Sequence, residues 1–167
     1  GTVVHRYYLE QFLGAHSTLI KGRCLEFQED SYSTRFGAGR VDSVDILNKE
    51  SDYPGSTIVA DLTVPNDIPS GHFDCIICTY VLHYIRNLDA FVAETHRILR
   101  PGGALLVGAP NITVHYKQFP ELWRFTAEGL RDLLGDHFAG GRVEVREFGN
   151  SLTAAGELRG LALEDFS

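Results

Sequence analysis

The sequence predicts a doubly wound α/β domain, in which a mostly parallel sheet carries helices on both faces. Short apolar segments typical of buried strands alternate along the chain with amphipathic helical segments, an alternation typical of parallel sheets. Residues 97–103 (Arg-Ile-Leu-Arg-Pro-Gly-Gly) end one such helix and lead directly into an apolar strand at residues 104–109. Proline stops the helix, and the two glycines allow the tight reversal that brings the next strand back to the sheet.

The elements before this motif follow in order. Apolar residues at helical spacing predict a helix over residues 8–20, with Gly22 just beyond its end. Short apolar segments predict strands at residues 23–27 and 40–46, followed by strands at residues 57–60 and 73–78. Residues 28–39 are close to the minimum length for a parallel crossover, so we expect only one helical turn there, near residues 33–36.

The second half of the chain continues the alternation. Apolar residues at helical spacing predict a helix over residues 88–99, before the strand at 104–109. An irregular, aromatic-rich loop follows over residues 110–125. Thr126 is a suitable N-cap for a helix that Gly135 ends. Alternation around Val143 and Val145 predicts a strand at residues 142–148, and residues 154–163 form a last predicted helix.

Length and charge limit the domain count and the partners. The 167 residues, 44% of them apolar, suffice for one domain, which we assign to residues 1–167. The formal net charge of -7 repels nucleic acids and anionic membranes, and no basic patch offsets it, so we expect neither as a partner. No apolar segment reaches the roughly 18 residues of a membrane helix, and the N-terminus has no signal-peptide pattern.

The three cysteines indicate buried thiols rather than a redox or zinc motif. Cys75 and Cys78 lie three residues apart on a predicted strand, so they point to opposite faces. We therefore expect small buried hydrophobic residues and a reducing, cytoplasmic location. No histidine pair has the spacing of metal ligands, so we assign no metal. The chain begins at Gly1 and has no methionine, and we expect it to be part of a longer polypeptide with other domains.

Taken together, the motifs resemble the class I S-adenosylmethionine-dependent methyltransferases, in particular the type-11 group. The resemblance implies a Rossmann-like methyltransferase fold, S-adenosylmethionine as cofactor, and methyl transfer to a small-molecule or sugar-containing acceptor. It extends from Arg23 to about Gly149 and rests on Leu25-Glu26, Val44-Asp45-Ile46, Asp61-Leu62, Phe73-Asp74, Val81-Leu82-His83-Tyr84-Ile85, the motif at residues 97–103 and Trp123-Arg124-Phe125-Thr126.

The predicted ribose contact is at the second strand. An acidic residue at the end of that strand can accept hydrogen bonds from both ribose hydroxyls, and Asp45, followed by Ile46, is placed there by the predicted strand boundary. The resemblance also implies that Glu26 helps to hold the ammonium of the methionine moiety. Asp45 could instead be an ordinary turn residue, and Glu26 a solvated residue that ends its strand.

The resemblance implies three further cofactor contacts. Asp61 would accept the exocyclic amine of adenine, and Leu62 would contribute its backbone or an apolar edge. Thr79 would contact the methionine moiety through its backbone. Asp61 also has an ordinary alternative as a turn residue after its strand.

The loop after the first strand departs from the family pattern. Members usually carry Glu-x-Gly-x-Gly-x-Gly there, whereas residues 26–32 read Glu-Phe-Gln-Glu-Asp-Ser-Tyr. The side chains of Gln28, Asp30 and Tyr32 would crowd the path that glycines leave open. Either the loop binds in a rearranged way, through Gln28 or Ser31, or cofactor affinity is weak or lost.

A second departure is at the end of the sheet. Family members finish with an antiparallel hairpin strand after the last helix, and no such strand is visible here. We expect that strand to lie outside this sequence.

Three residues are candidates for contacts with the acceptor. Methyl transfer mainly needs alignment of the nucleophile with the methyl group, and a general base only if the acceptor is a hydroxyl or similar group. His83, after the strand at residues 73–78, is the first candidate base. His115 and Tyr116 lie in the aromatic-rich loop with Lys117 and Phe119 and suggest an acceptor-side lid. Each histidine could instead be a packed loop residue.

Two other functions remain open. The absence of loop glycines favours a non-catalytic methyltransferase-like domain that serves as a structural or interaction module of a larger protein. A nicotinamide-dependent oxidoreductase is less well supported, because no G-x-G-x-x-G follows the first strand.

Overall fold

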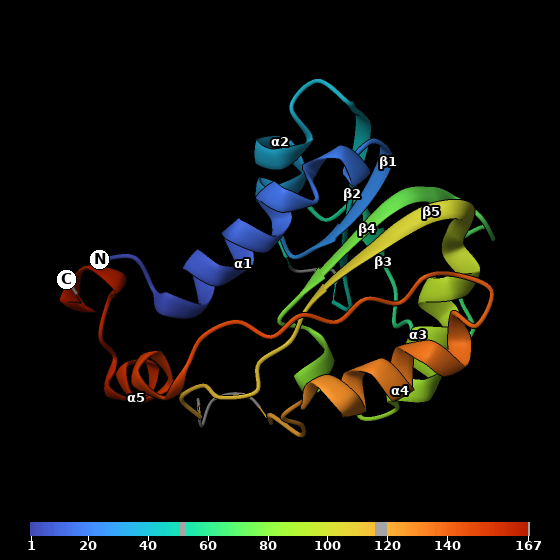
Figure 1. The fold of residues 1–167 in the computed structure, drawn as a ribbon. Helices are drawn as coiled ribbons and strands as arrows, with labels where there is room; N and C mark the ends of the chain where they lie inside the picture. Colours follow the sequence, from blue (N-terminus) through green and yellow to red (C-terminus); the bar gives the residue numbers. More distant parts are fainter. Residues whose placement is uncertain (51–52, 116–119, 167) are drawn as a thin grey trace.

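The protein is built around a parallel sheet. The computed structural model describes residues 1–50, 53–115 and 120–166 (Figure 1). Its five strands are all parallel and lie in the order β3-β2-β1-β4-β5. The central strand β1 spans Gly22–Phe27; β2 spans Val41–Asn48, β3 Ile58–Val59, β4 Phe73–Thr79 and β5 Leu99–Gly108. The predicted doubly wound α/β fold, with the strand near Arg23 at its centre, is confirmed.

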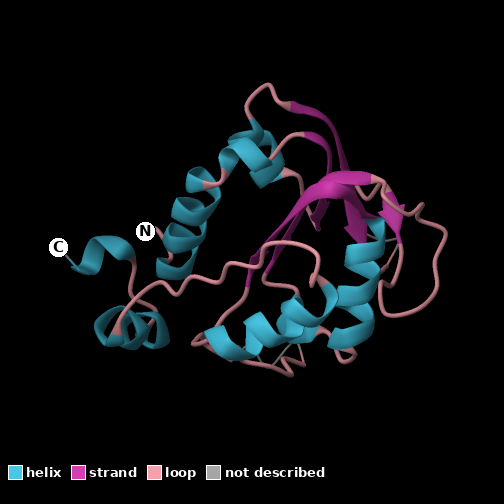
Figure 2. Ribbon diagram, turned by 45° about the vertical axis from the view of Figure 1, so that its right-hand side comes forward, coloured by secondary structure: helices cyan, strands magenta, loops and turns pink. Residues whose placement is uncertain are grey.

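Helices cover both faces of this sheet (Figure 2). On one face α1 (Val4–Ala15) and α2 (Ser31–Gly37) cover a core cluster that includes Leu9 and Leu13. On the other face α3 (Leu88–Ile98) and α4 (Ala127–His137) cover a larger cluster that includes Phe91 and Leu134. The helix α5 (Ser151–Arg159) follows an extended segment and contacts α1. Short 3-10 helices lie at Ser17–Leu19 (η1), Leu82–Tyr84 (η2) and Leu163–Phe166 (η3).

The cysteines occupy the positions expected of buried hydrophobic residues. Cys75 belongs to the core cluster under α1, together with Cys24, while Cys78 belongs to the cluster under α3. All three are buried free thiols. Because Cys75 and Cys78 point to opposite faces of β4, the prediction against a redox or metal motif at these two residues agrees with their geometry.

The motif at residues 97–103 connects α3 to β5. The register of the β4–β5 ladder passes from Phe73 opposite Leu99 to Cys75 opposite Ala104, so residues 100–103 bulge out of the ladder. A Cβ on Gly103 would lie 2.9 Å from the carbonyl oxygen of Asp74, a contact that requires glycine. The reversal is thus a bulge inside β5, which begins directly after α3 and five residues earlier than predicted.

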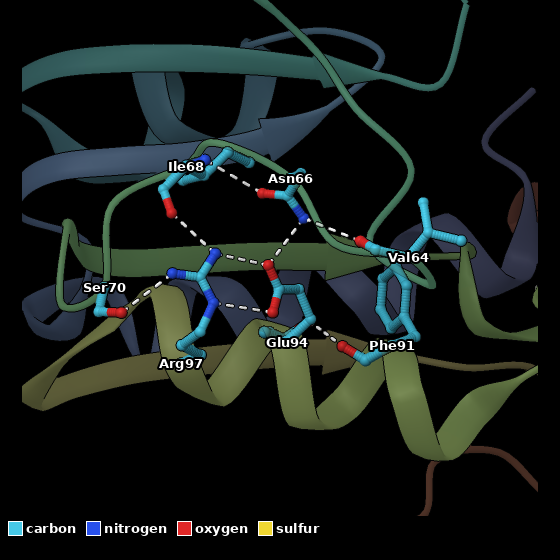
Figure 3. A network of polar contacts seen from close by, with 8 residues as sticks. Val64, Asn66, Ile68, Ser70, Phe91, Glu94 and Arg97 are labelled. Atoms are coloured by element: carbon cyan, nitrogen blue, oxygen red, sulfur yellow. Dashed lines mark hydrogen bonds and ion pairs between the residues drawn. The ribbon is translucent and has the colours of Figure 1, made fainter.

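Arg97 of this motif fastens the β3–β4 connection to α3 (Figure 3). Its guanidinium donates to the carbonyl of Ile68 at 2.7 Å and to the hydroxyl of Ser70 at 3.0 Å. It also pairs with Glu94, which accepts a further hydrogen bond from Asn66 at 2.7 Å. Two residues of α3 therefore hold the loop that leads into β4.

Several predicted boundaries are wrong. Helix α1 spans Val4–Ala15 rather than residues 8–20, and α5 spans Ser151–Arg159 rather than residues 154–163. The crossover helix α2 spans Ser31–Gly37 rather than a single turn. The strand β2 extends two residues beyond the predicted end and finishes at Asn48. Residues 142–148 are extended but form no strand. They are not hydrogen-bonded to β5 and instead line a cavity of which β5 forms another wall. Alternation indicates which faces a segment presents, but a strand also needs a partner.

No helix among the described residues has the length and apolar character needed to cross a bilayer.

Candidate functional site

The candidate cofactor site lies at the carboxyl ends of the central strands. The strand order reverses between β1 and β4, whose connections leave in opposite directions along the sheet. In open α/β sheets, ligands bind in the crevice at this reversal. The loops after β1, β2 and β4 therefore carry the residues to be considered.

The loop after β1 has the backbone conformation usually left to glycine. Gln28, at the position of the first family glycine, has a φ of 72°, which costs a residue with a Cβ about 1–2 kcal/mol. Its backbone N–H donates to the carbonyl of Leu47 at 3.3 Å. The turn is therefore kept without its glycine, and the side chains of Gln28 and Asp30 are exposed.

Glu26 is buried beneath this loop. Its carboxylate accepts hydrogen bonds from the backbone N–H of Tyr32 at 3.1 Å and of Ser33 at 2.8 Å, and from the Ser33 hydroxyl at 2.6 Å. Burial raises its pKa, although these hydrogen bonds oppose the shift. Glu26 thus caps the N-terminus of α2, where an anion also meets the helix dipole, and a ligand ammonium would share its oxygens with these donors.

Asp45 does not lie at the end of its strand. It accepts hydrogen bonds from the Arg23 Nε at 2.8 Å and from the Thr57 hydroxyl at 2.9 Å. The last residue of β2 is Asn48, which is 6% exposed and donates to the Ser56 hydroxyl at 2.8 Å. The predicted location of Asp45 is wrong because β2 is longer than predicted, and the side chain at the strand end is that of Asn48.

Asp61 follows β3 and lies beside the end of β2. Its carboxylate pairs with Lys49 at 2.9 Å and accepts hydrogen bonds from the hydroxyl and backbone N–H of Thr63 at 2.6 and 2.9 Å. Burial opposes ionisation, but these contacts outweigh it and lower the pKa of Asp61 to about 2. Asp61 is therefore a fixed anion at the edge of the sheet where β2 and β3 end.

The remaining predicted cofactor residues differ in exposure. Leu62 is 2% exposed and its side chain belongs to the core under α3, so only its backbone is available to a ligand. Ile46 lies within β2, and its backbone exchanges hydrogen bonds with Thr57. Thr79 is the last residue of β4, beside Gly108 of β5. It lies at the carboxyl edge, as the prediction requires.

The loop after β4 carries His83 in η2. The first residue of this loop, Tyr80, has a left-handed φ of 55°, and His83 itself is 3% exposed. The ring of His83 packs against that of Tyr84, with 3.9 Å between the centroids and a tilt of 42° between the planes. Burial lowers the pKa of His83, while the charge of Glu121 opposes the shift, so the imidazole is neutral at neutral pH.

Glu121, which the sequence reasoning missed, lies over this loop. Its side chain is 2% exposed, and it accepts hydrogen bonds from Arg124 at 2.6 Å and from His115 at 3.0 Å. Burial would raise the pKa of Glu121, but these hydrogen bonds lower it overall. The signal available in the sequence was a carboxylate next to the Trp-Arg-Phe-Thr motif that begins at Trp123.

The structure brings the two predicted acceptor-side histidines together. His83 Nε2 lies 4.0 Å from one oxygen of Glu121, and His115, whose side chain is 60% exposed, bonds the other. The rest of the predicted lid, Tyr116 with Lys117 and Phe119, lies outside the described residues.

A large cavity also reaches the carboxyl edge of the sheet, at the end of β4. It has a volume of about 1760 Å³ and is lined by α1, β5 and residues 140–150. Tyr80 and Gly108 are part of its wall, whereas the seven predicted cofactor residues are not. The cavity therefore meets the carboxyl edge of the sheet at the end of β4 but is separate from the candidate cofactor crevice.

Comparisons with known proteins agree with this arrangement. A family model described as a methyltransferase domain matches residues 27–107, slightly less than half of the chain. No curated protein matches the chain.

Solved structures share the fold at low sequence identity. An S-adenosylmethionine-dependent methyltransferase of Thermotoga maritima is 17% identical, with a TM-score of 0.59 over 81% of this chain and 72% of that one. For a Methanosarcina mazei S-adenosylmethionine-dependent methyltransferase these values are 14%, 0.54, 70% and 78%. A Haemonchus contortus phospholethanolamine N-methyltransferase, solved with S-adenosylhomocysteine, is 15% identical, with a TM-score of 0.58 over 78% of this chain and 36% of that one.

The sheet order, the matched segment and these neighbours together define the class. The chain has the fold of the S-adenosylmethionine-dependent methyltransferases described above, and its residues 27–107 match the model of a methyltransferase domain. The resemblance inferred from its motifs is therefore confirmed.

Proposed function

We propose that this chain binds S-adenosylmethionine at the carboxyl ends of β1, β2 and β4 and transfers its methyl group to a small-molecule or sugar-containing acceptor. The observation that carries the proposal is the left-handed backbone of Gln28. The loop keeps the course of a glycine turn at an energetic cost, which is expected where a site depends on that course.

The chain's own residues would bind and orient the two substrates. When bound, the cofactor supplies an electrophilic methyl group on a sulfonium. The fixed anion Asp61 would accept the adenine amine beside the backbone of Leu62. Thr79 would contact the methionine moiety of the cofactor, and the ammonium group of that moiety would lie near Glu26. Asn48, at the end of β2, would form the ribose side.

Calorimetric titration with S-adenosylhomocysteine tests the proposal. Because Gln28 and Asp30 replace glycines, we expect a Kd no tighter than roughly 100 μM, or about -5.5 kcal/mol. Asp61→Ala should remove detectable binding. Asp67→Ala, which changes an exposed carboxylate of the same β3–β4 connection, should leave binding unchanged.

The alternative is a methyltransferase-like module without catalysis. The hydrogen bonds that occupy both oxygens of Glu26 favour it, because they tie a residue of the cofactor crevice to α2. If neither the native chain nor a variant with Gln28 and Asp30 replaced by glycine binds the ligand, and circular dichroism shows that both are folded, the module becomes the better account.

A further inference from the structure

The two ring nitrogens of His83 have different surroundings. Nε2 faces the Glu121 carboxylate at 4.0 Å. Nδ1 is buried and has no hydrogen-bond partner among the described residues. A buried polar atom without a partner costs about 1–3 kcal/mol. A ligand that hydrogen-bonds to Nδ1 would remove this cost.

Charge and proton count determine which nitrogen carries the hydrogen. The contacts of Glu121 with Arg124 and His115 keep its pKa low, so its carboxylate can only accept hydrogen bonds. The pKa of His83 is lowered by burial, and a neutral imidazole has one N–H. Since Nε2 faces the carboxylate, the hydrogen belongs on Nε2, and Nδ1 carries a free lone pair.

Backbone contacts fix this pair of side chains relative to each other. The N–H of Leu122 donates to the carbonyl of His83 at 2.7 Å, and the indole of Trp123 donates to the carbonyl of Ile85 at 2.8 Å. The segment that carries Glu121 is therefore attached to the loop that carries His83, so their separation is part of the fold.

The other groups that face the imidazole do not compete with Glu121. The aromatic rings of Tyr84 and Tyr80 lie 3.9 and 6.3 Å away between centroids. The Arg124 charge opposes protonation of His83, but Arg124 is itself paired with Glu121. Among the described residues, Glu121 is thus the anion that faces this ring.

We propose that Glu121 is a positioning residue that fixes the Nε2–H tautomer of His83, so that Nδ1 receives the proton of the methyl acceptor. The inference rests on the proposed function. It restricts the acceptor to a molecule whose nucleophilic atom carries a hydrogen, such as a hydroxyl of a sugar.

The proton balance of the step follows from this geometry. The acceptor oxygen forms a bond to the methyl carbon, and the sulfur–methyl bond breaks with its electron pair remaining on sulfur. The acceptor proton passes to Nδ1 of His83. The resulting imidazolium presents its Nε2–H to the Glu121 carboxylate, which stabilises the new charge. Because Nδ1 is buried, an acceptor has to displace the groups that cover it.

Nuclear magnetic resonance of the intact chain with ¹⁵N-labelled histidine tests the tautomer directly. The chain has seven histidines, and the signals lost in His83→Gln identify those of His83. At neutral pH we expect the two-bond ¹H–¹⁵N pattern of an Nε2–H imidazole. Glu121→Gln should weaken this preference and lower the pKa of His83, while Glu121→Asp should restore part of both.

Glu128→Gln is the matched control, because it removes an exposed carboxylate in the first turn of α4, and it should leave the His83 signals unchanged. An Nδ1–H pattern in the native chain, or an unchanged pattern in a folded Glu121→Gln variant, would overturn the role of Glu121. An Nδ1–H pattern in the native spectrum overturns it even if Glu121→Gln does not fold. The measurement needs no cofactor, so failure to bind S-adenosylhomocysteine would separately refute the proposed function and with it the proton transfer.

Discussion

Backbone conformation, more than side-chain chemistry, is what the β1–α2 loop shares with glycine-rich loops. Gln28 has a φ of 72°, and Tyr80, which directly follows the neighbouring strand β4, has a φ of 55°. Both residues therefore adopt a conformation that L side chains disfavour, and both lie where a parallel strand ends. The sheet imposes these turns at its carboxyl edge even where the sequence does not offer glycine.

The strain at Gln28 makes a prediction. Gln28→Gly should raise the free energy of unfolding by up to about 1 kcal/mol, because relief of the left-handed strain exceeds the added flexibility of the unfolded chain. Chemical denaturation followed by circular dichroism measures this change. Glu29→Gly, at the next position, where φ is not positive, should be neutral or destabilising. A less stable Gln28→Gly variant would show that the side chain, and not the turn, matters at this position.

The site was only partly predictable from single residues. Asp61 and Thr79 were placed correctly at strand ends, since each directly follows or ends a short apolar segment. Asp45 was misplaced, because β2 continues through Leu47 to Asn48 and an apolar pattern does not mark where pairing stops. Glu121 was missed because its burial depends on contacts with a loop nearly forty residues earlier in the chain, which periodicity cannot show.

At the scale of elements, the fold was predictable where burial is strongest. The strands β1 and β4 and the helix α3 have long apolar faces, and all three were predicted close to their observed positions. Residues 142–148 alternate as a strand would, yet they remain unpaired. Pairing depends on which neighbours are present, and local alternation carries no information about that.

At this scale, the prediction concerns the clamp, that is, the hydrogen bonds by which Arg97 and Glu94 of α3 hold the β3–β4 connection. Arg97→Lys keeps the charge but loses the fork that reaches Glu94, Ile68 and Ser70 together. We expect a loss of about 1 kcal/mol in the free energy of unfolding, measured by urea denaturation. Arg131→Lys, at an exposed position of α4, serves as the control. Equal stability of the two variants would mean that the clamp contributes nothing measurable.

Across the whole molecule, the sheet is asymmetric. The strands β1 and β4 are each paired on both sides, whereas β5 is paired only with β4. Beyond β5 lies the cavity of about 1760 Å³, with residues 142–148 in its wall. The ends of the described chain are joined nearby, where Val3 bridges Ala162 and the Thr2 N–H donates to Glu164 at 3.0 Å.

This asymmetry predicts a gradient of stability that amide hydrogen exchange can map. Amides of β1 and β4 lie in ladders on both sides and should exchange only through global unfolding, so they should be the most protected. Amides of residues 142–148, which are extended without ladder partners, should exchange several orders of magnitude faster. Mass spectrometry of peptides from exchanged native protein separates these regions, and a chain that is unfolded before exchange gives the unprotected reference. Protection of residues 142–148 comparable to that of β4 would mean that in solution this segment pairs with a strand, and that the cavity beside β5 is closed.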